Sequence, residues 1–147
     1  MSDIQLKSVL LSNQETMGYR EREGGDEVIL LVHGNMTSSK HWDVVMENLD
    51  SRFKVYAVDM RGFGISTYHN RIRDLADFTA DLKLFTDAMG LTSFHLAGWS
   101  TGGGVCMQYA ADYPEQVKKL ILMASMSTRG YPYYKFGATG CPTSVED

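Results

Sequence analysis

The chain has 147 residues, of which 44% are hydrophobic and 22% are charged, a balance typical of one globular domain with a sizeable core. Its formal net charge is only −4, and its lysines and arginines are scattered rather than clustered. These features argue against nucleic acid or an anionic membrane surface as a partner.

The N-terminal residues 1–7 have neither the basic start nor the apolar stretch of a secretory signal, and no apolar run is long enough to cross a bilayer. We therefore expect a cytoplasmic protein without a membrane partner. The two cysteines, Cys106 and Cys141, show no C-x-x-C spacing and no nearby pair of histidines, so neither a disulfide framework nor a zinc site is indicated. The sequence predicts no metal and no cofactor.

Six extended segments are predicted. Residues 5–11 and 17–22, separated by a Ser-Asn-Gln turn, are predicted to form a hairpin. Four later segments are continuous apolar runs, which is typical of strands that are buried on both faces of a sheet. These runs are residues 27–33, 53–58, 94–97 and 117–123.

Three helices are predicted between these strands. Residues 42–49 and 75–89 carry apolar side chains at the spacing of an amphipathic helix. The second of these is bounded by Asp74, placed as an N-cap, and by Gly90, placed just after the last turn. A third helix is predicted over residues 101–113. It is expected to end there because the proline at position 114 disfavours the helical conformation for the residue before it.

Buried strands that alternate with helices imply right-handed βαβ connections. The predicted fold class is therefore α/β, with a mostly parallel sheet and helices on both faces. Ligands bind such sheets at the carboxyl ends of the strands. We assign residues 1–124 to this core. Residues 125–147 show no helical or strand periodicity, and we interpret them as a connection that leads out of the core.

The segment G-W-S-T-G, residues 98–102, has the pattern G-x-S-x-G where a strand is predicted to end and a helix to begin. A sharp turn there exposes the Ser100 hydroxyl by straining its backbone, and the turn needs small residues at positions 98 and 102. The alternative is a glycine-rich loop that cradles phosphate, but the motif G-x-x-x-x-G-K-[ST] is absent. Ser100 is the candidate catalytic nucleophile.

Acyl transfer also needs donors aimed at the oxyanion that forms when a serine attacks a carbonyl. The backbone N–H of Thr101 is one candidate, at a helix N-terminus, and the N–H of Asn35, in the loop after an earlier strand, is the second. We assign Asn35 and Thr101 to the oxyanion hole. Without Ser100, the loop around Asn35 would be interpreted as a tight turn in which Asn35 bonds its own backbone. The residues expected to contact the substrate are Gly34, Met36 and Trp99.

Three segments, V-H-G-N at residues 32–35, D-M-R-G-F-G at 59–64 and G-W-S-T-G at 98–102, resemble the motif series of the α/β-hydrolase family in order and separation. The resemblance runs from about residue 28 to residue 125. It implies that Ser100 is the nucleophile and that Asn35 and Thr101 form the oxyanion hole, as the residues themselves indicate.

The resemblance also implies that Asp59, Arg61 and Gly64 hold turns and loops and take no part in catalysis. Residues 33–42 are similar to haloalkane dehalogenases in particular. Those enzymes and the epoxide hydrolases of the family attack with an aspartate, so Ser100 argues against both activities.

The family places its catalytic acid, and then its histidine, after the nucleophile. Every histidine here precedes Ser100, namely His33, His41, His69 and His95. The acids that follow it lie at a predicted helix end or at the chain terminus, and they are Asp112, Glu115, Glu146 and Asp147. We expect His33 to support the oxyanion loop and His95 to be a packed or surface residue of a strand. A complete triad is not predicted.

The resemblance implies that the cap, the later strands and the acid–histidine pair lie outside this chain, with residues 125–147 leading toward the cap. Residues 1–147 alone are then expected to be nearly inactive, because an unactivated serine retains only what binding and the oxyanion hole supply. An uncovered sheet edge is expected to favour self-association or a complementary C-terminal fragment.

The sequence thus predicts a serine hydrolase that, in its complete form, acts on a small, largely apolar ester or related acyl substrate through an acyl-enzyme. The nearest alternatives are a carbon–carbon bond hydrolase, a lactonase or a peptidase of the same family. From another class, the missing base leaves open a non-catalytic binding protein built on a hydrolase half-fold.

Overall fold

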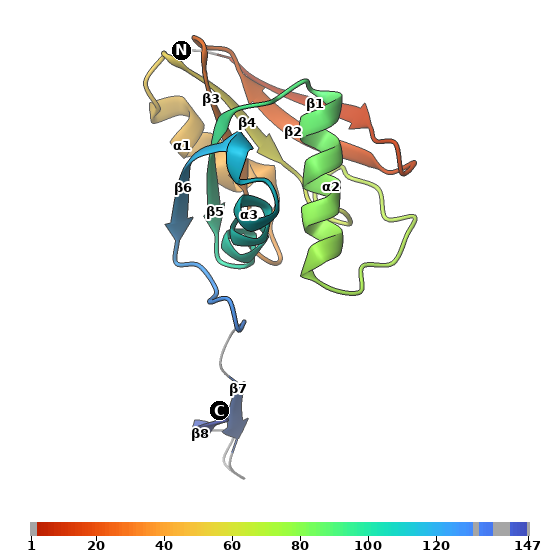
Figure 1. The fold of residues 1–147 in the computed structure, drawn as a ribbon, viewed down its shortest axis with the longest axis vertical. Coiled ribbons are helices and arrows are strands. Elements are labelled where there is room, and N and C mark those ends of the chain that lie inside the picture. Colours follow the sequence, from red (N-terminus) through yellow and green to blue (C-terminus); the bar gives the residue numbers. More distant parts are fainter. Residues whose placement is uncertain (1–2, 131–132, 137–141, 147) are drawn as a thin grey trace.

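The computed structural model describes residues 3–130, 133–136 and 142–146. A six-stranded sheet in the order β1-β2-β4-β3-β5-β6 forms its centre (Figure 1). The strands are β1 (Ile4–Leu10), β2 (Thr16–Arg22), β3 (Glu27–Val32), β4 (Phe53–Val58), β5 (Phe94–Trp99) and β6 (Val117–Met123). The strands β4, β3, β5 and β6 run parallel, and β1 and β2 are added in antiparallel fashion at one edge. All six lie where the sequence predicts them, although β5 extends beyond residue 97.

Helices cover both faces of the sheet (Figure 1). They are the 3-10 helix η1 (Ser39–Trp42), α1 (Asp43–Asn48), α2 (Leu75–Ala88), α3 (Thr101–Asp112) and the 3-10 helix η2 (Pro114–Gln116). On one face Trp42 and Met46 pack with Ala97, and on the other Phe85 of α2 and Tyr109 of α3 join the larger apolar cluster. The predicted α/β class, with a mostly parallel sheet and helices on both faces, is confirmed.

Local signals set most helix boundaries. The Asp74 side chain accepts a hydrogen bond from the Ala76 N–H (2.9 Å), and Gly90 has a φ of +67° just after α2. Both residues act as predicted. The helix predicted over residues 42–49 is observed as α1, except that Trp42 belongs to the 3-10 turn that begins after the cap residue Ser38.

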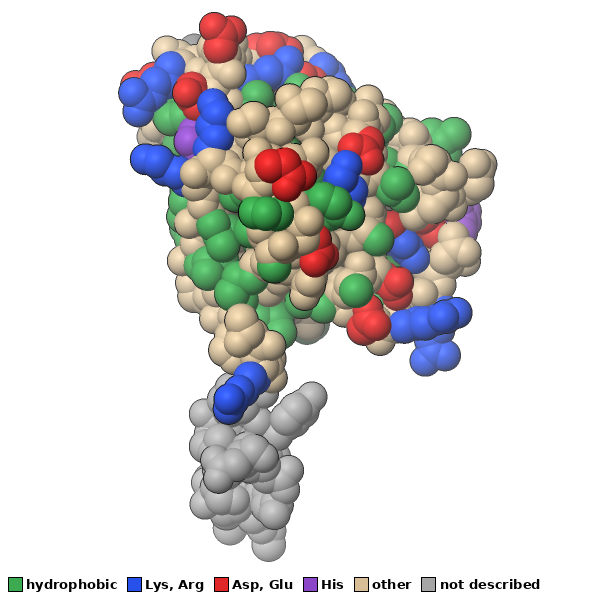
Figure 2. Space-filling view, in the orientation of Figure 1, with side chains coloured by type: hydrophobic (Ala, Val, Ile, Leu, Met, Phe, Trp, Pro, Cys, Tyr) green, Lys and Arg blue, Asp and Glu red, His purple; other side chains and the backbone are tan. Residues whose placement is uncertain are grey.

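The strand β6 is exposed, and the prediction that it is buried on both faces is wrong. Its last four residues, 120–123, are between 37% and 44% exposed. The physical reason is its position: β6 is the last strand of the sheet order and pairs with β5 alone among the described residues. Figure 2 shows hydrophobic side chains gathered on this side of the molecule.

Two short strands lie in the C-terminal segment, where the sequence analysis expects no strand periodicity. They are β7 (Tyr133–Phe136) and β8 (Pro142–Glu146), paired in antiparallel fashion in a sheet of their own. Aromatic residues favour strands, and the sequence of β7 carries this signal, whereas that of β8 contains no aromatic residue. Cys141 and Asp147 lie outside the described residues.

Candidate active site

Ser100 occupies the turn between β5 and α3 with a φ of 55° and a ψ of −120°. A residue other than glycine adopts positive φ only at a cost, on the order of 1–3 kcal/mol, and such strain clusters at functional sites. The Ser100 N–H donates to the Met123 carbonyl (3.1 Å), and the Ser100 carbonyl accepts from the N–H groups of Gly103 (3.0 Å) and Met126 (3.2 Å). These bonds tie the strained turn to the end of β6.

Gly98 and Gly102 make the turn sterically feasible. A Cβ atom on Gly98 would clash with the backbone of Gly102, and a Cβ atom on Gly102 would clash with the carbonyl oxygens of Val32 and His33. Backbone atoms cannot move aside as a flexible side chain can. The small residues required by the G-x-S-x-G pattern are therefore required by the observed packing as well.

The loop after β3 lies directly against this turn. A Cβ atom on Gly34 would lie 2.6 Å from the Trp99 ring and 3.1 Å from the Ser100 Cβ, so the structure brings these three residues together. Met36 is 89% exposed and has a φ of 57°, a strained conformation that the sequence analysis did not foresee. The Asn35 side chain accepts a hydrogen bond from the Met36 N–H (2.9 Å), so the side chain of Asn35 does bond the neighbouring backbone.

His33 holds this loop from the inside. It is fully buried, its Nδ1 lies 2.6 Å from the Gly34 carbonyl, and its Nε2 accepts a hydrogen bond from the Met60 N–H (3.0 Å). Because the Met60 amide can only donate, the ring proton resides on Nδ1, and Nδ1 donates to Gly34. The C=O and N–H of one trans peptide point in opposite directions, so the Asn35 N–H points away from His33. His33 therefore holds the loop that contains Asn35 in place, as predicted.

Protonation of His33 is expected to destabilise the fold. Burial lowers the pKa of His33 and outweighs the opposing effects of the Gly34 carbonyl and of Asp59. A lowered pKa in the folded state means that this contribution to stability is present above the unfolded pKa of about 6.5 and is lost as the pH falls. Urea unfolding at pH 7 and pH 5.5 measures it. We expect a smaller pH dependence in His33→Gln, since glutamine offers a donor and an acceptor but does not titrate.

The exposed His69 provides the matched control. We expect His69→Gln to retain the wild-type difference in the free energy of unfolding between the two pH values. An unchanged difference in His33→Gln would show that His33 is not the group that takes up the proton.

Asp59 and Gly64 hold the loop after β4 in place, as predicted. The Asp59 carboxylate accepts from the N–H groups of Ser39 (2.7 Å) and Ile65 (3.0 Å). Gly64 has a φ of 55°, and a Cβ atom there would clash with the Asp59 carboxylate. This arrangement fixes the loop that carries Met60, the partner of His33.

Arg61 forms a buried ion pair, which agrees with its predicted structural role. Its guanidinium donates to the two Asp81 carboxylate oxygens at 2.8 and 2.5 Å. Nearby, burial raises the pKa of Glu15, but hydrogen bonds from Thr67 and from the amides of residues 69 and 70 outweigh this effect. Together they lower the pKa of Glu15 to about 2. These bonds tie Arg61, Asp81 and Glu15 to one another and to the loop after β4, which is a structural role.

Two further histidines, His95 and His41, each contact another side chain. His95 bonds Glu27 (2.8 Å) near the start of β5, at the opposite end of that strand from Ser100. His41 stacks on Trp99, with ring centroids 4.4 Å apart and planes 9° apart. This stack could not be predicted from the sequence, because the two rings are 58 positions apart and no local pattern links them.

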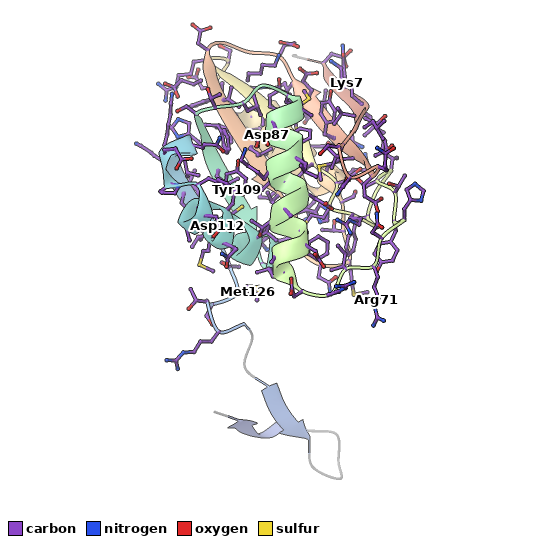
Figure 3. The ribbon with its side chains drawn as sticks, turned by 45° about the vertical axis from the view of Figure 1, so that its right-hand side comes forward. Lys7, Arg71, Asp87, Tyr109, Asp112 and Met126 are labelled. Carbon is purple, nitrogen blue, oxygen red and sulfur yellow. The ribbon has the colours of Figure 1, made fainter. Side chains whose placement is uncertain are left out.

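The acids after the nucleophile lie away from the turn. Asp112, the last residue of α3, accepts a hydrogen bond from Gln108 (2.9 Å) (Figure 3). At a rise of 1.5 Å per residue, it lies about 16 Å along the helix axis from the first residue, Thr101. Glu115 belongs to the 3-10 turn that follows. Glu146 is a residue of β8. None of these three acids lies in a loop that directly follows a parallel strand of the central sheet.

An apolar hollow of about 510 Å³ opens in the segment after β4, at the same sheet edge as the loop that follows β3. Its lining residues are Arg61, Gly62, Phe63, Tyr68, Ile72 and Phe78. The Phe63 ring packs edge-on against His33, with centroids 5.3 Å apart. Phe63 therefore lies between the hollow and His33, a contact that no sequence pattern indicated.

Within the described ranges, no group of three or more His, Cys, Asp or Glu side chains is arranged to hold a metal ion. Burial raises the pKa of the Cys106 thiol, so it has little thiolate to act as a nucleophile. The same ranges contain no helix with both the length and the apolar character needed to cross a membrane.

Comparison with known proteins agrees with this geometry. Residues 27–134 match the model of the alpha/beta hydrolase fold. The chain is 35% identical to a pimeloyl-[acyl-carrier protein] methyl ester esterase from Nitrosomonas europaea over 71% of this chain and 40% of that protein. It is 33% identical to a 2-hydroxy-6-oxononadienedioate/2-hydroxy-6-oxononatrienedioate hydrolase from a Pseudomonas species over 72% of this chain and 39% of that protein.

Solved structures show the same likeness. A loop variant of a haloalkane dehalogenase from Bradyrhizobium elkanii superposes with a TM-score of 0.80 at 28% identity, over 85% of this chain and 42% of that one. The chain spans 28% to 44% of the length of the curated relatives it matches. The matched family model, the sheet order and the strained serine turn together place this chain in the α/β-hydrolase family.

Proposed function

We propose that this protein, in its complete form, is a serine hydrolase that cleaves a small ester or related acyl substrate through an acyl-enzyme on Ser100. The strained backbone of Ser100, at φ 55° and ψ −120° between β5 and α3, is the observation that carries the proposal. The Asn35 and Thr101 amides would stabilise the oxyanion. Substrate contacts would come from Gly34, Met36 and Trp99.

An ester or related acyl substrate is supported by the similarity to the esterase of Nitrosomonas europaea at 35% identity. A carbon–carbon bond hydrolase is the second candidate, because the relative from Pseudomonas bears that kind of name at 33% identity. Both proposals place the nucleophile at Ser100, so the substrate that the complete protein cleaves distinguishes them.

We further propose that residues 1–147 by themselves are nearly inactive. His33 has both ring nitrogens committed to backbone partners, and His95 is bonded to Glu27 at the far end of β5. A general base must come within hydrogen-bond reach of the serine proton. An oxyanion hole without that base leaves only a small part of the rate enhancement.

Reaction with a fluorophosphonate probe tests this proposal. We expect the 147-residue chain to react with the probe at Ser100 at least about 10³-fold more slowly than a hydrolase with a complete triad. Peptide mapping by mass spectrometry locates the adduct. Rapid stoichiometric labelling of Ser100 would show that this chain contains a base, whereas labelling of another serine would contradict the assignment of the nucleophile.

A further inference from the structure

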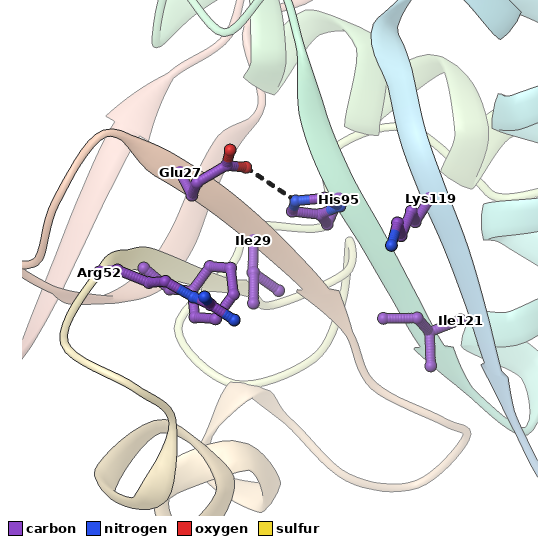
Figure 4. A pocket seen from close by; sticks show the side chains of 7 residues that line it. Glu27, Ile29, Arg52, His95, Lys119 and Ile121 are labelled. Carbon is purple, nitrogen blue, oxygen red and sulfur yellow. Dashed lines mark hydrogen bonds and ion pairs between the residues drawn. The ribbon is translucent and has the colours of Figure 1, made fainter.

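The central sheet has two outer strands among the described residues, β6 and β1, and they differ in character. Lys118 and Lys119 lie in the first half of β6, and Lys119 lines an open hollow together with His95 (Figure 4). Lysines on an outer strand discourage pairing with another chain. In contrast, β1 pairs with β2 in an unbroken register, and its sequence contains no proline and a single charged residue, Lys7, which forms an ion pair with Glu21. The strand β1 is therefore an open edge without the features that usually protect one.

The backbone groups of alternate β1 residues face this open edge. In β2, both the N–H and the C=O of Thr16 and of Gly18 form hydrogen bonds of 2.8 to 3.0 Å with the segment after β4. Their partners in β1, Leu10 and Ser8, therefore form the non-hydrogen-bonded pairs of the hairpin. The N–H and C=O of such residues point away from the paired strand. Those of Leu6, Ser8 and Leu10 are thus directed away from β2, where another strand can bind them.

The same alternate residues carry exposed apolar side chains. Leu6 is 48% exposed and Leu10 is 62% exposed, and they flank Ser8 on one face of the sheet. Ile65, which is 50% exposed, packs over Gly18, the residue opposite Ser8, so closely that a Cβ atom on Gly18 would clash with it. An exposed apolar strip beside an unpaired strand edge indicates an interaction surface.

We propose that two copies of this chain pair through β1 in antiparallel fashion, about a two-fold axis at Ser8. In this arrangement Ser8 lies opposite Ser8 of the second copy, and Leu6 of each copy lies opposite Leu10 of the other. Each of these three opposed pairs forms two N–H···O bonds, about six in all. The two sheets join into one, and a two-fold axis makes the interface complementary to itself.

Charge and side-chain position select this register. An axis at Lys7 would place the two Lys7 side chains directly opposite each other, and like charges in that position are destabilising. An axis at Leu6 would leave Leu10 outside the paired segment, and an axis at Val9 would leave out Leu6. With the axis at Ser8, Lys7 lies opposite Val9 and keeps its ion pair with Glu21. A second copy in this register therefore covers both exposed leucines without opposing like charges.

Paired charge substitutions test the proposal and its register by sedimentation equilibrium of the 147-residue chain. Leu6→Lys/Leu10→Lys places like charges opposite each other, and we expect the dissociation constant of the dimer to rise at least about tenfold. Leu6→Lys/Leu10→Glu places opposite charges there, so we expect a dissociation constant within about threefold of the unaltered value at low salt, rising as salt is added. Both leucines are exposed, so neither variant is expected to unfold, and thermal melts check this.

An engineered disulfide tests the axis independently. In Ser8→Cys/Cys141→Ser, the two introduced thiols lie on the proposed axis with Cα atoms about 5.5 Å apart, a separation that a disulfide spans. We expect a covalent dimer after mild oxidation. The matched control is Gln5→Cys/Cys141→Ser, which places its thiols far from each other across the interface and is expected to cross-link at least about tenfold more slowly.

Other results would overturn the proposal. They are a chain that stays monomeric up to about 1 mM, equal dissociation constants for the two charge variants, or equal cross-linking at positions 5 and 8. A dimer that Ile121→Lys dissociates and the β1 variants leave intact would place the interface at β6 instead. Ser100→Ala is expected to dimerise as the unaltered chain does, which separates this proposal from the proposed activity.

Discussion

Replacing Ser100 with alanine is expected to lower kcat/KM for a short-chain nitrophenyl ester by at least about 10⁴-fold in the protein expressed from its complete coding sequence. The loss follows from the chemistry: without the hydroxyl, no acyl-enzyme forms, and only binding and the oxyanion hole act on the substrate. The fold should persist, because the bonds that hold the turn use the Ser100 backbone amide and carbonyl. Initial rates under the same substrate range measure the effect.

Ser125 offers a matched control for this substitution. Its hydroxyl lies in the loop after β6 and donates to the Met126 carbonyl (2.8 Å), so Ser125→Ala removes a similar group near the same turn. We expect Ser125→Ala to retain at least about a tenth of the activity, as a loss of one hydrogen bond implies. If Ser100→Ala kept as much activity as Ser125→Ala, Ser100 would not be the nucleophile.

Replacing Arg61 with alanine is expected to lower the free energy of unfolding by about 3–5 kcal/mol. Arg61 is 7% exposed and its partner Asp81 is 1% exposed, so the substitution leaves a buried carboxylate without its cation. The Arg61 guanidinium also donates to the Asn70 carbonyl (3.0 Å), and losing that bond frees part of the loop after β4. Urea unfolding at pH 7 measures the change.

Arg71→Ala is the control for that effect. Arg71 lies on the same loop but is exposed and extends away from the sheet (Figure 3). We expect its substitution to change the free energy of unfolding by less than about 0.5 kcal/mol. The double variant Arg61→Met/Asp81→Leu is expected to recover much of the loss, since it removes both charges. Equal effects of Arg61→Ala and Arg71→Ala would show that the buried pair adds nothing to stability.

Local patterns in the sequence predict much of this fold. The apolar runs give the strands, and Asp74 and Gly90 bound α2 because capping depends on residues within one turn of the helix end. The exposure of β6 was not predicted, because the apolar run at residues 120–123 resembles a buried strand, although Lys118 and Lys119 come before it. Burial depends on which elements lie beside a strand, and no local pattern contains that information.

In the candidate site, too, features that depend on neighbouring residues were predicted and contacts between distant residues were not. The turn at Ser100 was predicted because its steric requirements fall on residues two positions away. The stack of His41 on Trp99 and the contact of Phe63 with His33 were missed, because these partners are 58 and 30 positions apart in the chain. The positive φ of Met36 was missed as well, since a methionine carries no signal for that conformation.

A crystal structure of the fluorophosphonate adduct tests the central claim most directly. If Ser100 is the nucleophile of an α/β-hydrolase, its Oγ carries the phosphorus, and the phosphoryl oxygen lies about 2.7–3.1 Å from the amide nitrogens of Asn35 and Thr101. An adduct on another residue, or a phosphoryl oxygen that contacts neither amide, would contradict the account.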